Sequence, residues 1–300
     1  MYIALALSDQ AQAADMPVKA PKVQPFLERF YFSVEGAYLF NGSPSNLDFL
    51  QEFNFPLRLI SPLRPSRNGG RAEIAFGALI DPTWDWRVAV SAAWLRTNSV
   101  AATDGDPIIP SSATASDKLR YQTFDGEIGA RTSGSGAVLR AFAGVRVLHA
   151  KNEINYTFDD GFKLGNFDHN TELWGVGPRA GFEATVPLNA TPAFVNLSGS
   201  ASAIFSRRSH DFNFSVVGFG ADERGSANLD RSLTVYNAEA SAALGYRFSA
   251  LSSVQVGYRV QQWWNMVPQV SQADRSGNFV SGESDVLTHG PFAKLTVGLP

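Results

Sequence analysis

The 300-residue sequence contains no cysteine, no long hydrophobic run and little charge, and each absence excludes a class of protein. Without cysteine the chain has no disulfide scaffold, no thiol catalysis and no zinc finger. No stretch approaches the ~20 consecutive apolar residues of a membrane-spanning helix, which excludes a helical membrane protein. Charged residues make up 18% of the chain and the net charge is −3, so electrostatics predicts no nucleic-acid partner.

Hydrophobic and aromatic residues are abundant. They make up 44% and 12% of the sequence, which excludes global disorder. The average hydropathy is nevertheless slightly polar. The two facts together predict that apolar residues are interleaved with polar ones.

Strict alternation of apolar and polar residues is the strongest pattern in the sequence. In one segment Val254, Val256, Tyr258 and Val260 share a face, and polar residues fill the positions between them. Alternation with period two is typical of a β-strand with one apolar side. Ten segments show it: 30–40, 71–80, 84–94, 119–131, 139–147, 175–186, 195–205, 233–248, 252–262 and 292–299. Most of them reach the ~9–11 residues that a tilted membrane-crossing strand requires.

The connections between these segments alternate in length. Short ones are rich in turn-forming residues, as at 81–83, 133–136, 189–192 and 249–251. The sequence predicts long loops at roughly 41–70, 101–118, 158–170, 215–232 and 268–286. Short periplasmic turns and long extracellular loops are typical of outer-membrane barrels. We therefore predict an all-β fold: a closed up-and-down antiparallel transmembrane β-barrel of about ten strands, with eight to twelve compatible with the pattern.

The polar face distinguishes a membrane barrel from a soluble β-sandwich or lipocalin-like barrel, which would alternate in the same way. It carries arginines together with acids among small residues, as a confined lumen would, whereas the apolar faces are almost free of charge. An Arg or Lys at mid-bilayer on the lipid side would cost about 2–4 kcal/mol. The predicted lumen-lining residues are Arg87, Arg140, Arg146, Arg179, Arg247, Arg259, Lys294, Glu35, Glu73, Asp125, Glu127, Glu183 and Glu239.

Aromatic residues lie near both ends of the predicted strands. Amphipathic rings suit the headgroup level of a bilayer, where they form girdles. The predicted girdle residues are Trp84, Trp86, Trp94, Tyr246, Phe248, Trp263 and Trp264.

The first residues resemble the end of a secretory signal peptide. A short apolar run, Met1–Leu7, is followed by Ala11-Gln12-Ala13, which has the A-x-A form of a cleavage site. We expect residues 1–13 to be a signal-peptide remnant, residues 14–29 a flexible periplasmic segment and residues 30–300 the outer-membrane barrel.

Two stretches resemble a known family. The segment Trp174-Gly175-Val176-Gly177-Pro178-Arg179-Ala180-Gly181-Phe182-Glu183 and the ending from His289 to Leu299 are similar to the Legionella-type major outer-membrane-protein family of porin-like barrels. The stretch Ala14–Pro21 also resembles the mature N-terminus of alphaproteobacterial outer-membrane proteins. The resemblance implies a bacterial outer-membrane location, with outer-membrane lipid and the barrel-assembly machinery as partners.

Catalytic and metal-binding motifs are weak. The four histidines, His149, His169, His210 and His289, stand apart in the sequence, and no G-x-S-x-G nucleophile motif occurs. The acidic run Asp159-Asp160-Gly161 does not have the spacing of a calcium loop. We expect no enzyme activity, no metal and no cofactor.

Two functions remain open. The first is porin-like passive diffusion of small hydrophilic solutes or ions through a narrow charged lumen, with a slight anion preference from the excess of basic side chains. The second is a closed structural or surface-interaction barrel whose long extracellular loops bind a partner. Ten strands enclose a lumen that side chains can fill, so both are compatible with the sequence.

Overall fold

The computed structural model describes residues 30–42, 67–97, 100–103, 112–134, 136–159, 164–188, 191–218, 221–273 and 279–299. The expected signal-peptide remnant 1–13 and the expected segment 14–29 lie outside these residues. The strands are β1 (Phe30–Asn41), β2 (Arg67–Leu79), β3 (Trp84–Thr97), β4 (Val100–Thr103), β5 (Ser112–Gly134), β6 (Ala137–Asp159), β7 (Leu164–Pro187), β8 (Ala193–Gly218), β9 (Ala221–Arg247), β10 (Ser252–Ala273) and β11 (Phe279–Leu299).

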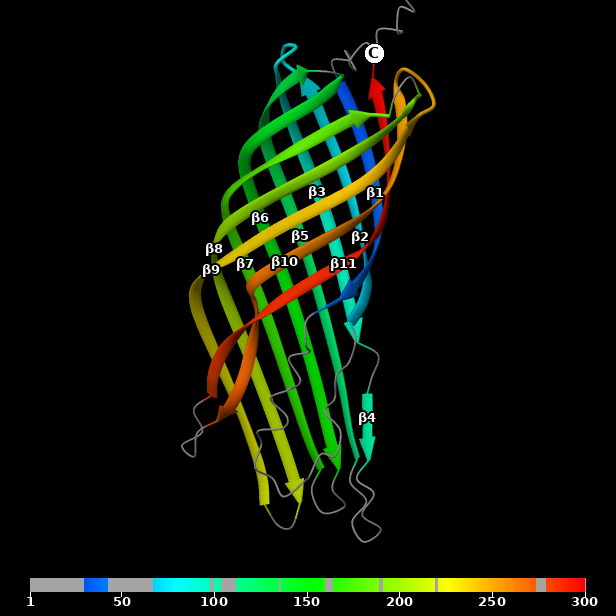
Figure 1. Ribbon diagram of the computed structural model, residues 1–300. Helices are drawn as coiled ribbons and strands as arrows, with labels where there is room; N and C mark the ends of the chain where they lie inside the picture. Colours follow the sequence, from blue (N-terminus) through cyan, green and yellow to red (C-terminus); the bar gives the residue numbers. More distant parts are fainter. Residues whose placement is uncertain are drawn as a thin grey trace, which may run out of the picture.

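Ten of these strands close into an antiparallel barrel (Figure 1). Each pairs with its neighbours in the chain, β1 pairs with β11, and β3 pairs with β5, so that β4 remains a short strand at the edge of β5. Closure leaves no free edge in the part of the wall where all ten strands pair, as a bilayer demands. Beyond it, the described residues of β9 before Tyr236 have no partner on β10, and those of β11 before Thr288 have none on β1. The predicted ten-stranded up-and-down barrel is confirmed.

The strands are strongly tilted (Figure 1). Following direct cross-strand partners from Tyr31 around the barrel leads to Val286 on β11. Tyr31 itself pairs with Gly298 on that strand. Going once around the barrel therefore shifts the pairing by 12 residues along β11. This offset is the stagger that closing a tilted sheet requires.

Alternation sets the two faces of the wall. In β3, Val90 and Trp94 are about half exposed, whereas Ser91 and Leu95 between and beyond them are buried. Neighbouring side chains on a strand point to opposite faces, so the apolar set forms the outer wall and the other set fills the lumen. An outer wall of exposed valine, leucine and aromatic side chains fits hydrocarbon.

The strands extend much further than predicted at the end opposite the short turns, which we call the long-strand end (Figure 1). The predicted loops 101–118, 158–170 and 215–232 are wrong over much of their length. There β5 begins at Ser112, β6 reaches Asp159 and β8 reaches Gly218. These extensions lie beyond any bilayer, so they need no apolar outer face, and the pattern that marks a membrane strand is absent from them.

The predicted girdle residues lie on the outer wall with one exception. Trp84, Trp94 and Trp264 are 39–47% exposed. Trp263 is fully buried inside the barrel, and its assignment to the girdle is wrong. Trp174 and Phe205 join the girdle instead, since each is more than half exposed. Trp86, Tyr246 and Phe248 lie on the outer wall at the short-turn end.

No helix in the described part of the chain is long and apolar enough to cross a membrane.

Candidate functional site

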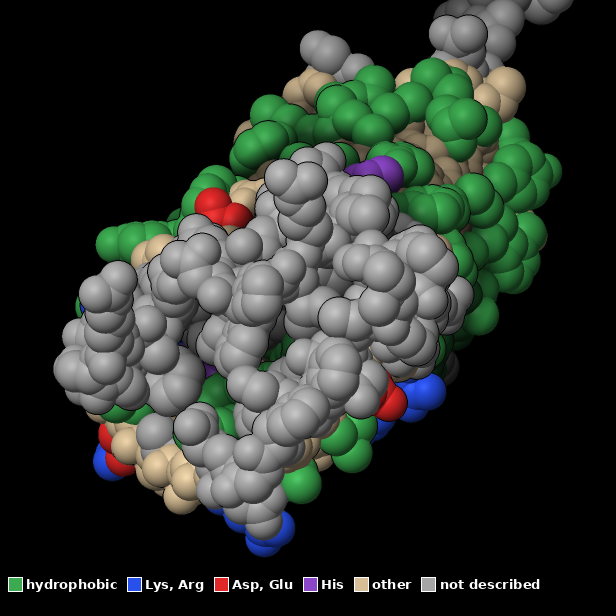
Figure 2. All heavy atoms as spheres, turned by 90° about the horizontal axis from the view of Figure 1, so that it is seen from below, with side chains coloured by type: hydrophobic (Ala, Val, Ile, Leu, Met, Phe, Trp, Pro, Cys, Tyr) green, Lys and Arg blue, Asp and Glu red, His purple; other side chains and the backbone are tan. Residues whose placement is uncertain are grey.

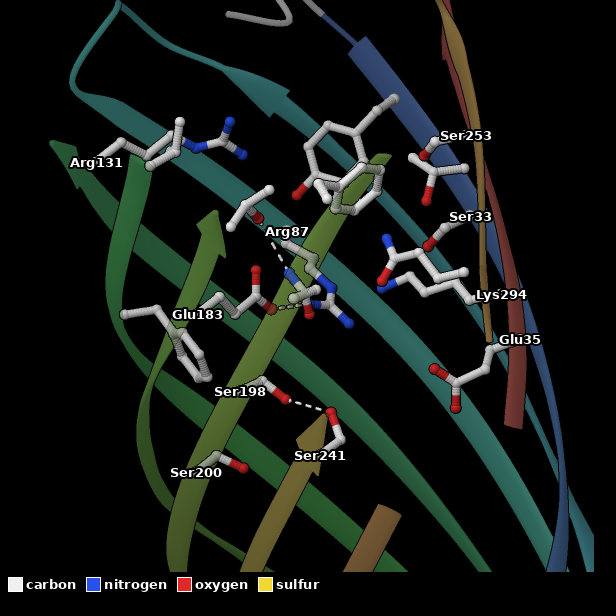
Figure 3. Close-up of a pocket in the computed structure, with 18 of the residues that line it drawn as sticks. Ser33, Glu35, Arg87, Arg131, Glu183, Ser198, Ser200, Ser241, Ser253 and Lys294 are labelled. Carbon is white, nitrogen blue, oxygen red and sulfur yellow. Dashed lines mark hydrogen bonds and ion pairs between the residues drawn. The ribbon is translucent and has the colours of Figure 1, made fainter. Parts of the chain in front are cut away.

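The lumen contains a cavity of about 560 Å³ at the short-turn end. Figure 3 shows Ser33, Glu35 and Lys294 along one side of it and Glu183 with Ser198 on the other. Turn residues Pro82 and Thr83 also line it. The predicted lumen residues that line the cavity are Glu35, Glu73, Arg87, Asp125, Arg179, Glu183, Glu239, Arg247, Arg259 and Lys294.

Behind the cavity, one group of ion pairs is centred on two buried acids. Asp85 accepts hydrogen bonds from Arg131 and from Arg140, whose Nη2 lies 2.7 Å from Oδ1. Glu127 accepts from Arg140 at 3.1 Å and from Arg179 at 2.7 Å.

A second group joins strands on opposite sides of the lumen. Arg71 on β2 contacts Glu73 at 2.6 Å and Glu239 on β9 at 3.3 Å. Arg87 on β3 contacts Glu73 at 2.9 Å and Glu183 on β7 at 2.8 Å. Arg259 donates to Glu35 through both terminal nitrogens, and its charge lies close to Glu239, with Nε 2.9 Å from Oε1. Side chains far apart in the sequence thus tie the wall together across the lumen.

The most enclosed pair is Arg146 with Asp125. The guanidinium donates from Nε to Oδ1 and from Nη2 to Oδ2, both at 2.7 Å, and from Nη1 to Asn237 at 2.6 Å. Arg146 is 1% exposed and Asp125 5%. A two-bonded arginine–carboxylate fork is the strongest form of ion pair, and a charge this deep needs such a partner to remain charged.

Two cations at the cavity form no ion pair with an acid among the described residues. Arg247 lies over the ring of Phe194 at 5.2 Å from the ring centroid, inside the ~6 Å range of a cation–π interaction. Lys294 is half-buried and lies opposite Glu35 on β1, whose carboxylate binds Arg259 instead. The cavity therefore keeps some positive charge that the network does not neutralise.

An apolar layer fills the lumen beyond the ionic network. It is a single cluster of inward-facing side chains from nine of the ten barrel strands, and most are 0–1% exposed. The apolar layer comprises Leu39, Ala93, Leu95, Leu119, Tyr121, Leu148, Ala150, Leu173, Ile204, Val235, Trp263, Met266, Val267 and Val286. Among the described residues, these side chains pack against one another across the lumen and leave almost none of their surface exposed.

The apolar layer is level with the girdle near the long-strand end. Leu95, Leu173 and Trp263 are the chain neighbours of Trp94, Trp174 and Trp264, which face outward. Adjacent strand residues lie at the same height on opposite faces. The apolar packing of the lumen therefore lies at the membrane boundary rather than in the middle of the barrel.

All thirteen predicted lumen residues face inward, and the sequence analysis missed two partners and the apolar layer. Arg71 and Asp85 belong to the network although they were not singled out. Each lies in phase with a predicted lumen residue, so alternation alone could have found them. Ile204 and Val235, apolar residues on the polar face, were visible signals of the layer.

His169 and His210 lie outside the membrane-spanning part, five residues beyond the girdle residues Trp174 and Phe205. The rings of His169 and His210 stack with centroids 5.6 Å apart, and Thr171 lies 3.4 Å and 3.2 Å from them. Burial, helped by the positive charge of Arg208, lowers the pKa of each histidine to about 4. Among the described residues, no three His, Asp or Glu side chains gather to hold a metal ion.

We expect these histidines to make the extension less stable in mild acid. Unfolded histidine has a pKa near 6.5, so between pH 6.5 and 4 the unfolded chain binds more protons than the folded one. The free energy of unfolding therefore falls as the pH falls through this window, on the order of 1 kcal/mol per pKa unit and histidine. Urea titrations at several pH values should show the slope in wild type and a smaller one in the H169Q/H210Q variant; equal slopes would contradict it.

Comparisons with known proteins agree with this architecture. The family model of the Legionella pneumophila major outer membrane protein precursor matches residues 72–298. No curated protein matches the sequence. Similar solved structures include the outer membrane protease OmpT of Escherichia coli (9% identity, 90% of this chain and 97% of that chain, TM-score 0.44).

Two further solved barrels are similar at the same level. The translocator domain of autotransporter NalP from Neisseria meningitidis has 10% identity over 91% of this chain and 88% of that chain, with a TM-score of 0.45. A major outer membrane protein from Thermus thermophilus has 10% identity over 88% and 99%, with a TM-score of 0.32. With the family model matching most of its barrel, the chain belongs to the Legionella major outer membrane protein family and is a bacterial outer-membrane β-barrel.

Proposed function

We propose that this protein is a closed outer-membrane barrel that presents its long strands at the cell surface as a structural and interaction platform. The observation that carries the proposal is the apolar layer, whose side chains fill the lumen without exposed area. A hydrophilic solute would have to leave its hydration shell to pass this layer. Passive diffusion, the first function expected from the sequence, is less well supported by this lumen.

The long strands supply the surface part of the proposal. Strands β5 to β9 run for 23 to 27 residues, whereas a tilted crossing needs only about 9–11. In barrels of this kind the short turns face the periplasm, which directs the extension outward from the cell. The proposal includes no catalytic step and no cofactor.

Planar-bilayer recording tests the proposal. We expect wild-type protein to give no conductance steps above background, and liposomes that contain it not to swell in small sugars. Protease protection of the barrel and its heat-modifiable migration on gels serve as controls for insertion. Steady, ohmic steps from inserted protein would overturn the closed barrel. A reversal potential favouring anions would then assign the path to the cavity that holds Lys294 and Arg247.

A further inference from the structure

Four cations form a compact block on the outer wall, immediately beyond the girdle at the long-strand end. Arg96 on β3 is the direct cross-strand partner of Lys118 on β5, and Arg120 on β5 is the direct partner of Lys151 on β6. All four face outward, because Leu95, Leu119 and other residues between them are buried in the lumen. We call Arg96, Lys118, Arg120 and Lys151 the cationic patch.

The arrangement of the cationic patch is unfavourable by itself. Directly opposed side chains have Cβ atoms ~5 Å apart, and like charges in such positions destabilise a sheet. The two like-charged pairs are also next to each other, because Lys118 and Arg120 lie two residues apart on β5. Such a cluster is expected where an anion from outside the chain neutralises it.

Acidic neighbours compensate only one side of the cationic patch. Lys151 lies 3.4 Å from Glu172 on β7, and Lys118 has Glu153 as its partner on β6. Arg96 and Arg120 have no acid partner among the described residues; their other cross-strand partners are Asn68 and Trp94. The two arginines are exposed and free to donate several hydrogen bonds to one anion.

The height of the cationic patch identifies the anion. Arg120 is the direct partner of Trp94, a girdle residue that is 47% exposed. Lys151 lies two residues beyond His149, whose ring stacks on the girdle residue Trp174. Figure 2 shows Lys and Arg side chains at the rim of this end, next to the hydrophobic wall. Aromatic girdles mark the headgroup level, so the patch is where lipid phosphates lie.

We propose that the cationic patch binds the phosphate groups of a phosphorylated lipid in the outer leaflet of the outer membrane. Arg96 and Arg120 donate paired hydrogen bonds to phosphate oxygens, a geometry that the planar guanidinium favours. Lys118 and Lys151 add charge, and the apolar wall below Trp94 receives the acyl chains. This inference does not depend on whether the lumen conducts.

Binding of lipid A to the purified barrel in neutral detergent micelles tests the proposal. We expect R96Q/R120Q to bind diphosphorylated lipid A about tenfold more weakly than wild type, because the charge-assisted hydrogen bonds from both guanidinium groups to phosphate are lost. The matched control is R207Q, which removes an exposed outward arginine whose charge Asp230 already compensates at 2.5 Å. It should leave the affinity unchanged.

Two further measurements separate binding from folding and lipid from free phosphate. Without lipid, R96Q/R120Q should be as stable as wild type or slightly more stable, because opposed like charges are removed; with lipid A it should be less stable than wild type. Dephosphorylated lipid A should bind wild type and variant equally weakly. Equal affinity of wild type and R96Q/R120Q for lipid A, or competition by inorganic phosphate at the same concentration as lipid A, would overturn the proposal.

Discussion

Replacing Asp125 by alanine lowers the free energy of unfolding by about 3–5 kcal/mol, because it leaves the guanidinium of Arg146 charged and buried without its carboxylate. Arg146 is 1% exposed, and both oxygens of Asp125 accept hydrogen bonds from it. Asn237 keeps its contact with Nη1 but carries no charge. Urea titration in detergent micelles, followed by tryptophan fluorescence, measures the loss.

Two variants control for this result. D230A removes the acid of an exposed pair, Arg207–Asp230, and should cause no measurable loss because solvent replaces the carboxylate. D125A/R146M removes both charges of the buried pair and should recover much of the stability, since no uncompensated charge remains. A D125A loss below about 1 kcal/mol, the level of an exposed pair, would show that water reaches Arg146 and that the network is open.

The ionic network illustrates what sequence alone predicts in a barrel. The strand pleat fixes a period of two, so the face of each side chain follows from its parity once a single residue of the strand is placed. Charged residues in phase with one another, such as Arg140 and Arg146 on β6, were therefore assigned to the lumen correctly. Their partners could not be predicted, because pairing across the lumen depends on the stagger of 12 residues, which no single strand encodes.

The length of the strands was not predictable from the same pattern. The membrane part has an apolar outer face because that face meets lipid, whereas the outer face of the extension meets water and can carry polar residues; buried apolar residues such as Ile154 and Phe212 lie on its inner face. Asn213 and Ser215, for example, lie on β8 opposite Ser226 and Arg224 on β9, with no apolar alternation on the outer side. Backbone hydrogen bonds continue the hairpin there together with inward-facing rings such as Phe212 and Phe214, whose centroids lie 6.0 Å apart, and the outer face leaves no membrane pattern in the sequence.

The wrong prediction for Trp263 came from following residue type instead of the alternation along the strand. Continuing the outward series Val254, Val256, Tyr258 and Val260 places Trp264 outside and Trp263 inside, as the structure has them. The girdle assignment instead followed the preference of tryptophan for interfaces. A tryptophan was not expected inside because the lumen was predicted to be polar, although Ile204 and Val235 on the polar face pointed to the apolar layer that receives Trp263.

The adjacent tryptophans provide the sharpest test of the apolar layer. W263A removes a fully buried side chain that packs edge-on against Tyr121, with ring centroids 5.5 Å apart, and is expected to cost about 3–5 kcal/mol. W264A removes a lipid-facing ring of the same type one residue away and should cost clearly less. The two variants therefore separate lumen packing from interface anchoring in one strand.

Fluorescence quenching by brominated lipids gives a second readout that depends on position rather than stability. Trp264 faces hydrocarbon, so W264A should lose part of the lipid-quenchable emission of wild type, whereas W263A should lose emission that brominated lipid does not reach. Equal losses of quenchable emission in the two variants would place both rings at the lipid surface. The lumen would then lack the side chain that fills much of the apolar layer, and the argument for a closed barrel would lose its main support.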